Sequence, residues 1–365
     1  MQVLHISGAV SWRGGEQQLV NLHDALKKKA VQQAIFCPKN SALAKYCKAN
    51  GLQYFTFSGS GGFNVVAAFQ LKKLVTSNAA YSLVHLHDSD AHSIGYLAGL
   101  LGVKTPMVLS RKVIFGIKNS FFTKWKYNAS CIRKIVCVSN AVKEVVRKKI
   151  KDPSKLVVVY EGIKPPASKL PSFVLPTQIR EKHFDFLIGY AAALTVEKDH
   201  DTFLQTAKLL LEKNPHIGFL LAGTGKEKNN IAEKIRQMGL TGNVFMLGFC
   251  DQVPSLMNKL DLLLFTSRQE GFPVTILEAF YSSLPVVATA AGGIPEMIED
   301  GITGFLCEPG DATTLSLKVQ EILGNEALRK TITENAYRFV LRFNDDTMAG
   351  NMLNVYNSIL LQNQE

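Results

Sequence analysis

The sequence has no regular arrangement of cysteines. Its six cysteines are scattered along the chain, and no two of them form a Cys-x-x-Cys pair. Disulfide frameworks and cysteine-based zinc sites both need regular or paired cysteines. The scatter therefore argues against both classes of site, and we expect buried free thiols in a reducing compartment.

The sequence also lacks a long hydrophobic run. No apolar stretch reaches the roughly 18 residues that a membrane-spanning helix needs, and the N-terminal residues MQVLHISGAV predict a strand rather than a signal peptide. We therefore expect a cytoplasmic protein. Apolar residues make up 47% of the chain and charged residues 19%, which is ordinary for a folded protein.

Acidic residues are scarce in the first half. Residues 1–165 hold 24 Lys and Arg against 7 Asp and Glu, a net charge of +17, whereas the remaining residues carry −6. A positive surplus of this size repels itself unless an anionic partner lies close. Nucleic acid, an anionic membrane surface and a phosphorylated acceptor would each meet that need.

Short apolar runs alternate with amphipathic stretches along the whole chain. Continuous apolar strands separated by helices are typical of parallel sheets covered on both faces. A length of 365 residues suits two α/β domains better than one core. In the first half the expected strands are Val3–Ser7, Gln33–Cys37, Gln53–Phe57, Leu83–His87, Met107–Ser110, Ile135–Ser139 and Leu156–Tyr160.

A proline-rich segment interrupts the alternation, which then starts again. This segment has few apolar residues and no periodicity, so we interpret residues 166–183 as a linker. The sequence thus predicts an N-terminal domain over 1–165, a C-terminal domain over 184–344 and a final helix over 345–365. In the second half the expected strands are Phe186–Ala191, Gly218–Ala222, Val244–Phe249, Leu262–Thr266 and Val286–Thr289, and the expected helices are Asp201–Glu212, Lys226–Met238 and Val274–Tyr281.

The strongest functional signal directly follows the expected strand Leu262–Thr266. Gly271 permits a tight turn there, and Pro273 suits the first position of the next helix, because its missing N–H would be unpaired anyway. The free amides of a helix start form an anion site that suits a diphosphate. Glu270 before the turn and Glu278 within the helix would accept hydrogen bonds from sugar and ribose hydroxyls. The alternative is that Glu270 caps the helix and Glu278 is a surface residue.

These residues belong to an ordered set of motifs that resembles glycosyltransferase family 4. The set comprises Glu270-x7-Glu278, Leu284–Thr289 (LPVVAT), Gly292–Glu296 (GGIPE) and Asp300–Gly304 (DGITG). The resemblance covers essentially the whole chain and is strongest over residues 261–311. It implies the GT-B fold, in which two Rossmann-like α/β domains face each other across a cleft and the C-terminal helix crosses back to the first domain. It also implies transfer of a sugar from a UDP- or GDP-sugar to an acceptor, with retention of the anomeric configuration.

The resemblance implies roles for residues of the second domain. Glu270 would contact the hydroxyls of the donor sugar, Glu278 would contact the ribose, and Lys198 would offset the charge that builds on the departing diphosphate. The family usually has an Arg where this chain has Ala193, so one of two expected cations is missing. The other donor-binding candidates, whose glycines have ordinary strand-to-helix turns as the alternative, are Gly223, Gly225, Phe249, Gly271, Phe272, Pro273 and Val274.

Further candidates follow the first expected strand of the N-terminal domain. Gly14 and Gly15 let the backbone approach a ligand closely, and the resemblance implies that this loop lies near the donor phosphate and the acceptor. Arg13 would supply some of the positive charge that Ala193 does not, with a purely structural turn as an equal alternative.

Two histidines end the fourth expected strand. The resemblance implies a His here that meets the reacting sugar, and alternation along the strand places His85 and His87 on one side. We prefer His87 as the catalytic residue, together with Lys198 and Glu270, because His87 is nearer the carboxyl end of the strand, where ligands bind in open α/β sheets. Arg111 and Lys112 follow the fifth strand and are further candidates.

The segment 115–127 mixes basic and aromatic residues. Such mixtures suit membrane surfaces and also nucleic acid. We expect reversible binding to an anionic membrane, at the inner face of the cytoplasmic membrane; the alternative is a solvated helix face with its aromatic rings in the core. The residues concerned are Phe121, Phe122, Trp125, Tyr127, Lys118, Lys124 and Lys126.

No metal and no other cofactor is expected, because this fold class needs none and the nucleotide-sugar is a co-substrate. The expected acceptor is a saccharide or a lipid-linked group, and synthesis of a bacterial cell-surface polysaccharide or lipopolysaccharide is the leading interpretation. Two alternatives stay open. One is a nucleotide-sugar 2-epimerase of the same fold; the other is a basic nucleic-acid-binding protein, which would leave Glu270 and Glu278 without a purpose, so that we expect no nucleic-acid partner.

Overall fold

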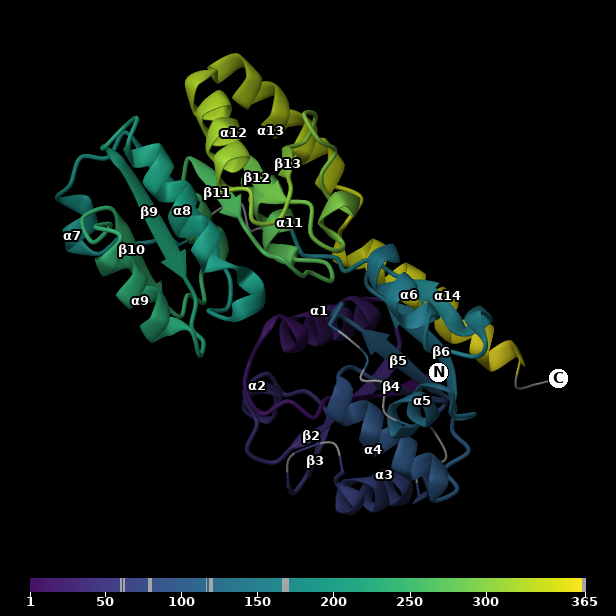
Figure 1. Cartoon of the computed structure of the whole chain (residues 1–365). Coiled ribbons are helices and arrows are strands. Elements are labelled where there is room, and N and C mark those ends of the chain that lie inside the picture. The colour runs from purple at the N-terminus through teal and green to yellow at the C-terminus, as the bar shows by residue number, and fades with distance from the viewer. Residues whose placement is uncertain are drawn as a thin grey trace. The chain divides into compact units, whose positions relative to one another are not determined.

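The chain folds as two compact units, each built on a parallel sheet. The computed structural model describes residues 1–59, 61, 63–77, 81–115, 117, 121–165 and 171–362. One unit comprises Met1–Lys164 and Phe343–Glu365, and the other comprises Pro165–Arg342. Helices flank both sheets (Figure 1). The predicted α/β class with two Rossmann-like domains is confirmed.

The first unit has a seven-stranded sheet in the order β3-β2-β1-β4-β5-β6-β7, with parallel neighbours throughout. Its strands are β1 Gln2–Ile6, β2 Gln32–Pro38, β3 Tyr54–Phe57, β4 Leu83–Leu86, β5 Met107–Arg111, β6 Ile132–Cys137 and β7 Leu156–Val158. Its helices are α1 Gly14–Lys28, α2 Ala42–Ala49, α3 Val65–Ser77, α4 Ser89–Leu100, α5 Phe121–Tyr127, α6 Asn140–Arg147 and α14 Asp345–Gln362, with a short 3₁₀ turn over Pro153–Lys155.

The second unit has a six-stranded sheet in the order β10-β9-β8-β11-β12-β13, again parallel. Its strands are β8 Phe186–Ala191, β9 Ile217–Ala222, β10 Val244–Gly248, β11 Leu262–Phe265, β12 Val286–Thr289 and β13 Phe305–Cys307. Its helices are α7 Thr177–Arg180, α8 His200–Leu211, α9 Lys228–Gln237, α10 Val253–Met257, α11 Val274–Tyr281, α12 Ala312–Gly324 and α13 Glu326–Val340, with 3₁₀ turns over Val196–Lys198 and Ile294–Glu296.

The C-terminal helix α14 returns to the first unit, as predicted. A bridge between Ile163 and Asn344 brings the chain back, and a Cβ on Gly162 would lie 2.2 Å from the carbonyl oxygen of Asn344, so only glycine allows this approach. The apolar side of α14 then packs with α1 against the sheet, where the fully buried Tyr356 joins a cluster that includes Val3. This burial explains why the last helix belongs to the first unit, although no strand follows it.

Two regions differ from the prediction. Strand β13 was not expected, because a strand of three residues leaves almost no pattern in a sequence. Part of the predicted linker is packed: Phe173 and Leu175 lie against the second unit's core, and Ile179 in α7 is buried there. Residues 166–170 of that linker lie outside the described residues.

The strand order creates a topological switch point in each sheet. From β1 the chain adds β2 and β3 on one side of the first sheet, then crosses to β4 and adds β5, β6 and β7 on the other side. The second sheet does the same between β8 and β11. The loops that leave two such central strands diverge, and ligands of open α/β sheets bind in the crevice at their carboxyl ends. Each unit therefore has one place where a ligand site is expected.

No helix within the described part of the chain combines the length and the apolar character needed to span a bilayer.

Candidate active site

Two predicted site residues meet at the switch point of the second unit. Lys198 lies in the loop between β8 and α8, and Glu270 lies in the loop between β11 and α11. The Lys198 ammonium forms an ion pair with the Glu270 carboxylate. Glu270 is buried and Lys198 is only partly exposed. The sequence predicted both residues as parts of the donor site, and the structure brings their side chains into direct contact.

A second layer of hydrogen bonds orients Glu270. The hydroxyl of Ser267 donates to Glu270 Oε1 at 2.7 Å, and the hydroxyl oxygens of Ser267 and Tyr190 lie 2.8 Å apart. Tyr190 OH in turn donates to the carbonyl oxygen of Lys198 at 2.8 Å. Glu270, Ser267 and Tyr190 thus each have a polar partner, which is the condition for keeping a carboxylate buried.

Gly292 holds the backbone of Glu270 from the other side. It has a φ of +58°, which disfavours residues other than glycine, and a Cβ there would lie 2.0 Å from the carbonyl oxygen of Glu270. The next amide, Gly293 N–H, donates to that same carbonyl at 3.0 Å. The Gly-Gly pair in the GGIPE motif therefore has a direct structural reason, which is close backbone contact with the Glu270 turn.

Asp199 ties the two loops together next to the ion pair. It adopts a φ of +47° and caps α8, since its carboxylate accepts from the backbone N–H of Thr202. The Arg268 guanidinium donates to the same carboxylate at 2.6 Å through Nε, and Arg268 N–H donates to the Glu197 carbonyl at 2.9 Å. These bonds fix the spacing between the loop that carries Lys198 and the loop that carries Glu270.

Glu278 lies in α11 and is half-buried. Burial raises the pKa of its carboxyl from the ordinary 4.5 to about 7. Among the described residues, no side chain or backbone group forms a hydrogen bond or ion pair with its carboxylate. Contact of this carboxylate with a ribose stays a prediction.

Helix α11 has the predicted bounds, Val274–Tyr281, but Pro273 lies one position earlier than the first helical position that the sequence suggested for it. Pro273 is its N-cap, with φ −75° and ψ 102°, rather than its first helical residue, and Val274 opens the helix. A proline N-cap has no side-chain acceptor for the amides of the first turn. The Ile276 N–H donates to the Pro273 carbonyl oxygen at 3.0 Å, which leaves the N–H groups of Val274 and Thr275 for an anion. Phe272 and Gly271 are buried beside this turn.

The glycines after β9 bring neighbouring loops into contact. A Cβ on Gly223 would lie 1.8 Å from the Ala192 carbonyl oxygen, and one on Gly225 would lie 2.1 Å from the Leu194 carbonyl oxygen. Both glycines therefore have a structural role in packing the loops that follow β8 and β9. Phe249 after β10 is largely exposed, so its ring is accessible. Whether these residues also bind a donor stays a prediction.

The switch point of the first unit holds three buried histidines. His5 in β1 pairs in register with His85 in β4, and His87 follows directly. His5 Nδ1 and His87 Nε2 lie 2.9 Å apart, while His85 Nδ1 lies 2.7 Å from the hydroxyl of Tyr356 and His85 Nε2 lies 2.8 Å from that of Ser110. The predicted grouping of His85 and His87 is confirmed, and their ring centroids are 4.0 Å apart.

Burial lowers the pKa of all three histidines, that of His5 to about 3. The positive charge of a neighbouring histidine adds to each shift, from His23 at His5, from His5 at His85, and from His85 and His5 at His87, and Lys112 adds to the shifts of His85 and His87. One ring nitrogen from each lies within 4.8 Å of the others, which is a geometry that could hold a metal ion. However, both ring nitrogens of His5 and of His85 already face protein partners. A metal would have to displace several of these hydrogen bonds, so the cluster fits a polar network better than a metal centre.

The glycine loop of the first unit lies beside the same switch point. Arg13 is the N-cap of α1, and its backbone N–H donates to the Glu16 carboxylate at 3.0 Å, which is one half of a capping box. A Cβ on Gly14 or Gly15 would meet no atom within 4 Å, so the space above this helix start is open. A cavity of about 630 Å³ adjoins it, with Arg13, Gly8 and Asp88 in its lining.

Arg111 and Lys112 are engaged within the first unit. Lys112 Nζ lies 2.8 Å from the Glu161 carboxylate and 3.5 Å from the Gly15 carbonyl oxygen, which places it beside the glycine loop. Arg111 donates to the Phe115 carbonyl oxygen at 2.5 Å.

Within α5, part of the basic and aromatic segment is exposed and part of it is buried. Phe121 and Trp125 are exposed with ring centroids 4.3 Å apart, and Lys124 is exposed beside them. Lys126 and Tyr127 are buried instead, because Lys126 Nζ donates to the Ser93 hydroxyl at 3.0 Å and Tyr127 packs on His92. The expectation that these two residues belong to an outward basic–aromatic surface is therefore wrong, and Phe122 is half-buried. Lys118 lies outside the described residues.

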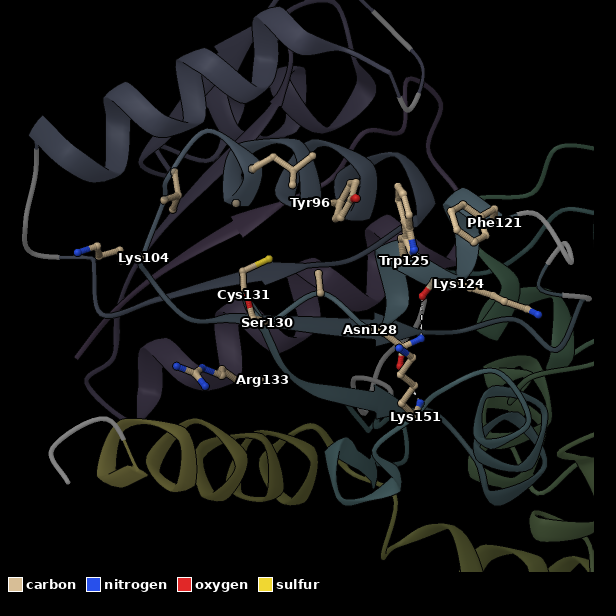
Figure 2. A pocket seen from close by; sticks show the side chains of 14 residues that line it. Tyr96, Lys104, Phe121, Lys124, Trp125, Asn128, Ser130, Cys131, Arg133 and Lys151 are labelled. Carbon is tan, nitrogen blue, oxygen red and sulfur yellow. Dashed lines mark hydrogen bonds between the residues drawn. The ribbon is translucent and has the colours of Figure 1, made fainter.

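The exposed rings border a cavity of about 750 Å³ between α4, α5 and the start of β6. Figure 2 shows the rings of Tyr96, Trp125 and Phe121 along one wall. Among the described residues that line it there are four cations and no acidic side chain: Lys104, Lys124, Arg133 and Lys151.

Sequence reasoning missed the residues that support the predicted ones. His5 could have been found, because it has the same position relative to the end of its strand as His85 has in the neighbouring strand. No sequence pattern marks Tyr190 and Ser267, because a residue with a buried hydroxyl looks like any other core or turn residue until its hydrogen-bond partner is known.

The raised pKa of Glu278 makes stability depend on pH. The folded state holds this proton more tightly than the unfolded state. Glu278 therefore has no effect on the free energy of unfolding below about pH 4.5, lowers it progressively as the pH rises, and lowers it most above about pH 7. We expect Glu278→Gln to raise the free energy of unfolding by up to about 3 kcal/mol at pH 8 and to leave it unchanged at pH 4. Urea unfolding at both pH values, with the exposed Glu321→Gln as control, checks this; an equal effect at the two pH values would contradict it.

Comparisons with known proteins agree with this geometry. Residues 12–165 match the family model described as Glycosyltransferase Family 4, and residues 175–339 match the one described as Glycosyl transferases group 1. The chain is 23% identical over 290 residues to the capsular polysaccharide biosynthesis glycosyltransferase CapM of Staphylococcus aureus, which covers 73% of this chain and 76% of that protein. It is 26% identical over 249 residues to the UDP-Gal:α-D-GlcNAc-diphosphoundecaprenol α-1,3-galactosyltransferase of Escherichia coli, which covers 63% of each.

The fold has counterparts among crystal structures. Anabaena Alr3699/HepE in complex with UDP-glucose superimposes with a TM-score of 0.85 at 20% identity, over 98% of this chain and 100% of that one. At this identity the likeness shows the GT-B fold alone. The two family models match successive parts of the chain that together make up most of its length, and their boundaries follow those of the two units. The chain therefore belongs to glycosyltransferase family 4 and is a glycosyltransferase with the GT-B fold.

Proposed function

We propose that this enzyme transfers a sugar from a nucleoside-diphosphate sugar with retention of the anomeric configuration, and that the donor binds at the switch point of the second unit. The observation that carries this proposal is the Lys198–Glu270 ion pair, a cation and a carboxylate held together where a ligand is expected. UDP is the favoured nucleotide, because the Escherichia coli relative is named for a UDP-sugar donor and Anabaena HepE binds UDP-glucose.

Each residue has a role in the proposed reaction. Lys198 and the open amides at the start of α11 meet the diphosphate, while Glu270, released from Lys198 but still held by Ser267, accepts hydrogen bonds from sugar hydroxyls. Glu278 accepts from the ribose. The acceptor hydroxyl forms the new bond to the anomeric carbon on the face from which the diphosphate leaves, the bond to the diphosphate breaks, and the departing phosphate oxygen takes the proton.

The acceptor is a saccharide or a lipid-linked group, in the synthesis of a bacterial surface polysaccharide. The names of the two relatives support this, since one acts in capsular polysaccharide biosynthesis and the other on a saccharide carried by diphosphoundecaprenol. Membership of the family favours transfer over the two alternatives, an epimerase and a nucleic-acid-binding protein.

The first unit attaches to an anionic membrane through the cavity beside α5. Its exposed rings suit the headgroup level, and its cations attract anionic headgroups without competition from an acidic side chain in the described lining. A lipid-linked acceptor would then be met at the membrane surface.

Loss of either member of the ion pair should slow turnover without unfolding the enzyme. We expect Glu270→Gln and Lys198→Ala each to lower kcat roughly 100- to 1,000-fold at saturating donor, since removing one charged or hydrogen-bonding contact to a transition state costs about 2.7–4 kcal/mol. Product formation from a panel of UDP- and GDP-sugars measures this. The exposed pair Lys318 and Glu321 provides matched controls in Lys318→Ala and Glu321→Gln. Near-normal turnover in both site variants would refute the assignment.

Activity should survive chelation. Lys198 and the start of α11 supply the positive charge that a metal would otherwise bring, and the histidine cluster of the first unit is occupied by its own hydrogen bonds. We expect unchanged product formation after treatment with EDTA. Complete loss of activity, restored by manganese or magnesium, would show that a metal holds the diphosphate.

Membrane attachment should be visible in the fluorescence of Trp125. The chain has two tryptophans, and Trp12 is half-buried against Tyr46, so a Trp12→Phe background leaves Trp125 as the reporter. We expect a blue shift with vesicles that contain anionic lipid and none with neutral vesicles. Lys124→Glu should weaken binding at least fivefold, since each lysine near an anionic bilayer contributes about 1 kcal/mol, whereas the exposed Lys48→Glu on α2 should not. Equal, negligible binding to both vesicle types at low salt would remove the membrane from the proposal.

A further inference from the structure

A chain of hydrogen bonds runs through the core of the first unit and ends at His87. The side-chain amide of Gln33 donates from Nε2 to the carbonyl oxygen of His23 at 2.9 Å, and its Oε1 lies 3.0 Å from His5 Nε2. His5 Nδ1 then lies 2.9 Å from His87 Nε2. All these side chains are buried, and His87 Nδ1 at the end of the chain has no partner among the described residues.

The surroundings of Gln33 set the direction of the first link. An amide nitrogen only donates, and Gln33 Nε2 faces two carbonyl oxygens, those of His23 and of Val31 at 3.4 Å. The amide oxygen must therefore face His5, and an oxygen only accepts. It follows that His5 carries its proton on Nε2 and donates it to Gln33.

The charge state of the histidines sets the next link. Burial, with contributions from neighbouring histidines, holds the pKa of His5 at about 3 and that of His87 well below its usual range, so both rings are neutral near pH 7. A neutral ring has one protonated nitrogen. Since the proton of His5 is on Nε2, its Nδ1 accepts, and His87 must donate from Nε2. The remaining nitrogen of His87, Nδ1, then bears a lone pair.

We propose that Gln33 and His5 are positioning residues that fix the tautomer of His87, so that its Nδ1 is presented to the ligand as a hydrogen-bond acceptor. The ligand group that fits is a hydroxyl of a saccharide, and a phosphate or carbonyl oxygen, which has no proton to donate, does not fit. This rests on the proposed sugar transfer, and on the role that the family resemblance implies for His87, namely contact with the reacting sugar. His85 stands apart from the chain, because Ser110 and Tyr356 occupy both of its nitrogens.

Long-range ¹H–¹⁵N spectra of histidine-labelled enzyme read the tautomer directly, without substrate. The chain has eight histidines, and the spectrum of a His87→Asn variant assigns the signals of His87. We expect protonated Nε2 and unprotonated Nδ1 at both His5 and His87. A proton on His87 Nδ1 in the unaltered enzyme would overturn the proposal.

Variants separate positioning from simple support of the core. Gln33→Leu removes the acceptor that orients His5, so we expect a mixed tautomer at His87 and a roughly tenfold fall in kcat/KM. His5→Asn places an amide oxygen near the former Nδ1 and should retain the Nε2–H tautomer of His87, whereas His5→Leu should not. Gln18 is a buried glutamine of α1 that takes no part in this series of hydrogen bonds. Gln18→Leu is therefore the matched control and should leave the His87 signals unchanged.

The outcomes distinguish this inference from the proposed function. An unaltered His87 tautomer in Gln33→Leu would overturn the role of Gln33 and His5. The expected tautomers combined with full turnover in His87→Asn would instead show that His87 does not meet the sugar, and would overturn the assigned ligand while leaving the positioning of the ring established.

Discussion

The contact between Lys198 and Glu270 depends on two strands that are distant in sequence and adjacent in space. Strands β8 and β11 are neighbours in the second sheet, although their site residues are 72 positions apart. Because both strands are parallel and the chain changes direction between them, their loops leave the same edge and diverge there. The supporting contacts from Tyr190, Asp199 and Gly292 all act on the two loops that this arrangement brings together.

A buried ion pair needs this support. Taking two charges out of water costs more than their attraction returns unless further hydrogen bonds complete the site. Glu270 has the Ser267 hydroxyl as such a partner, and the Ser267 hydroxyl lies next to that of Tyr190. Glu278 shows the opposite case, since burial without a partner raises its pKa to about 7. The carboxylate of Glu270 thus has partners within the protein, whereas that of Glu278 has none among the described residues.

The first unit also buries polar groups at its switch point, but these groups are neutral. Three histidines share its switch point, and burial together with the charge of a neighbouring histidine keeps each of them uncharged. The return of α14 is part of this arrangement, because Tyr356 from the last helix reaches the ring of His85. The C-terminal helix therefore contributes a hydrogen-bonding partner to the polar core beside β1 and β4. Its return to the first unit affects the histidine cluster as well as the stability of the core.

The sequence by itself determined the fold class, most strand positions and the identity of Lys198, Glu270, Glu278 and His87 as candidates, because apolar periodicity and ordered local motifs are written into consecutive residues. Its errors were also local. Pro273 was placed one position too far into its helix, and Lys126 and Tyr127 were assigned to a surface, because a stretch of seven helical residues does not reveal which side faces the core. Only the tertiary structure decided that Lys198 contacts Glu270, that Gln33 and His5 reach His87, and that Tyr356 reaches His85. These contacts join residues whose proximity arises from strand order and helix packing, and no local pattern encodes the partner of a buried polar group.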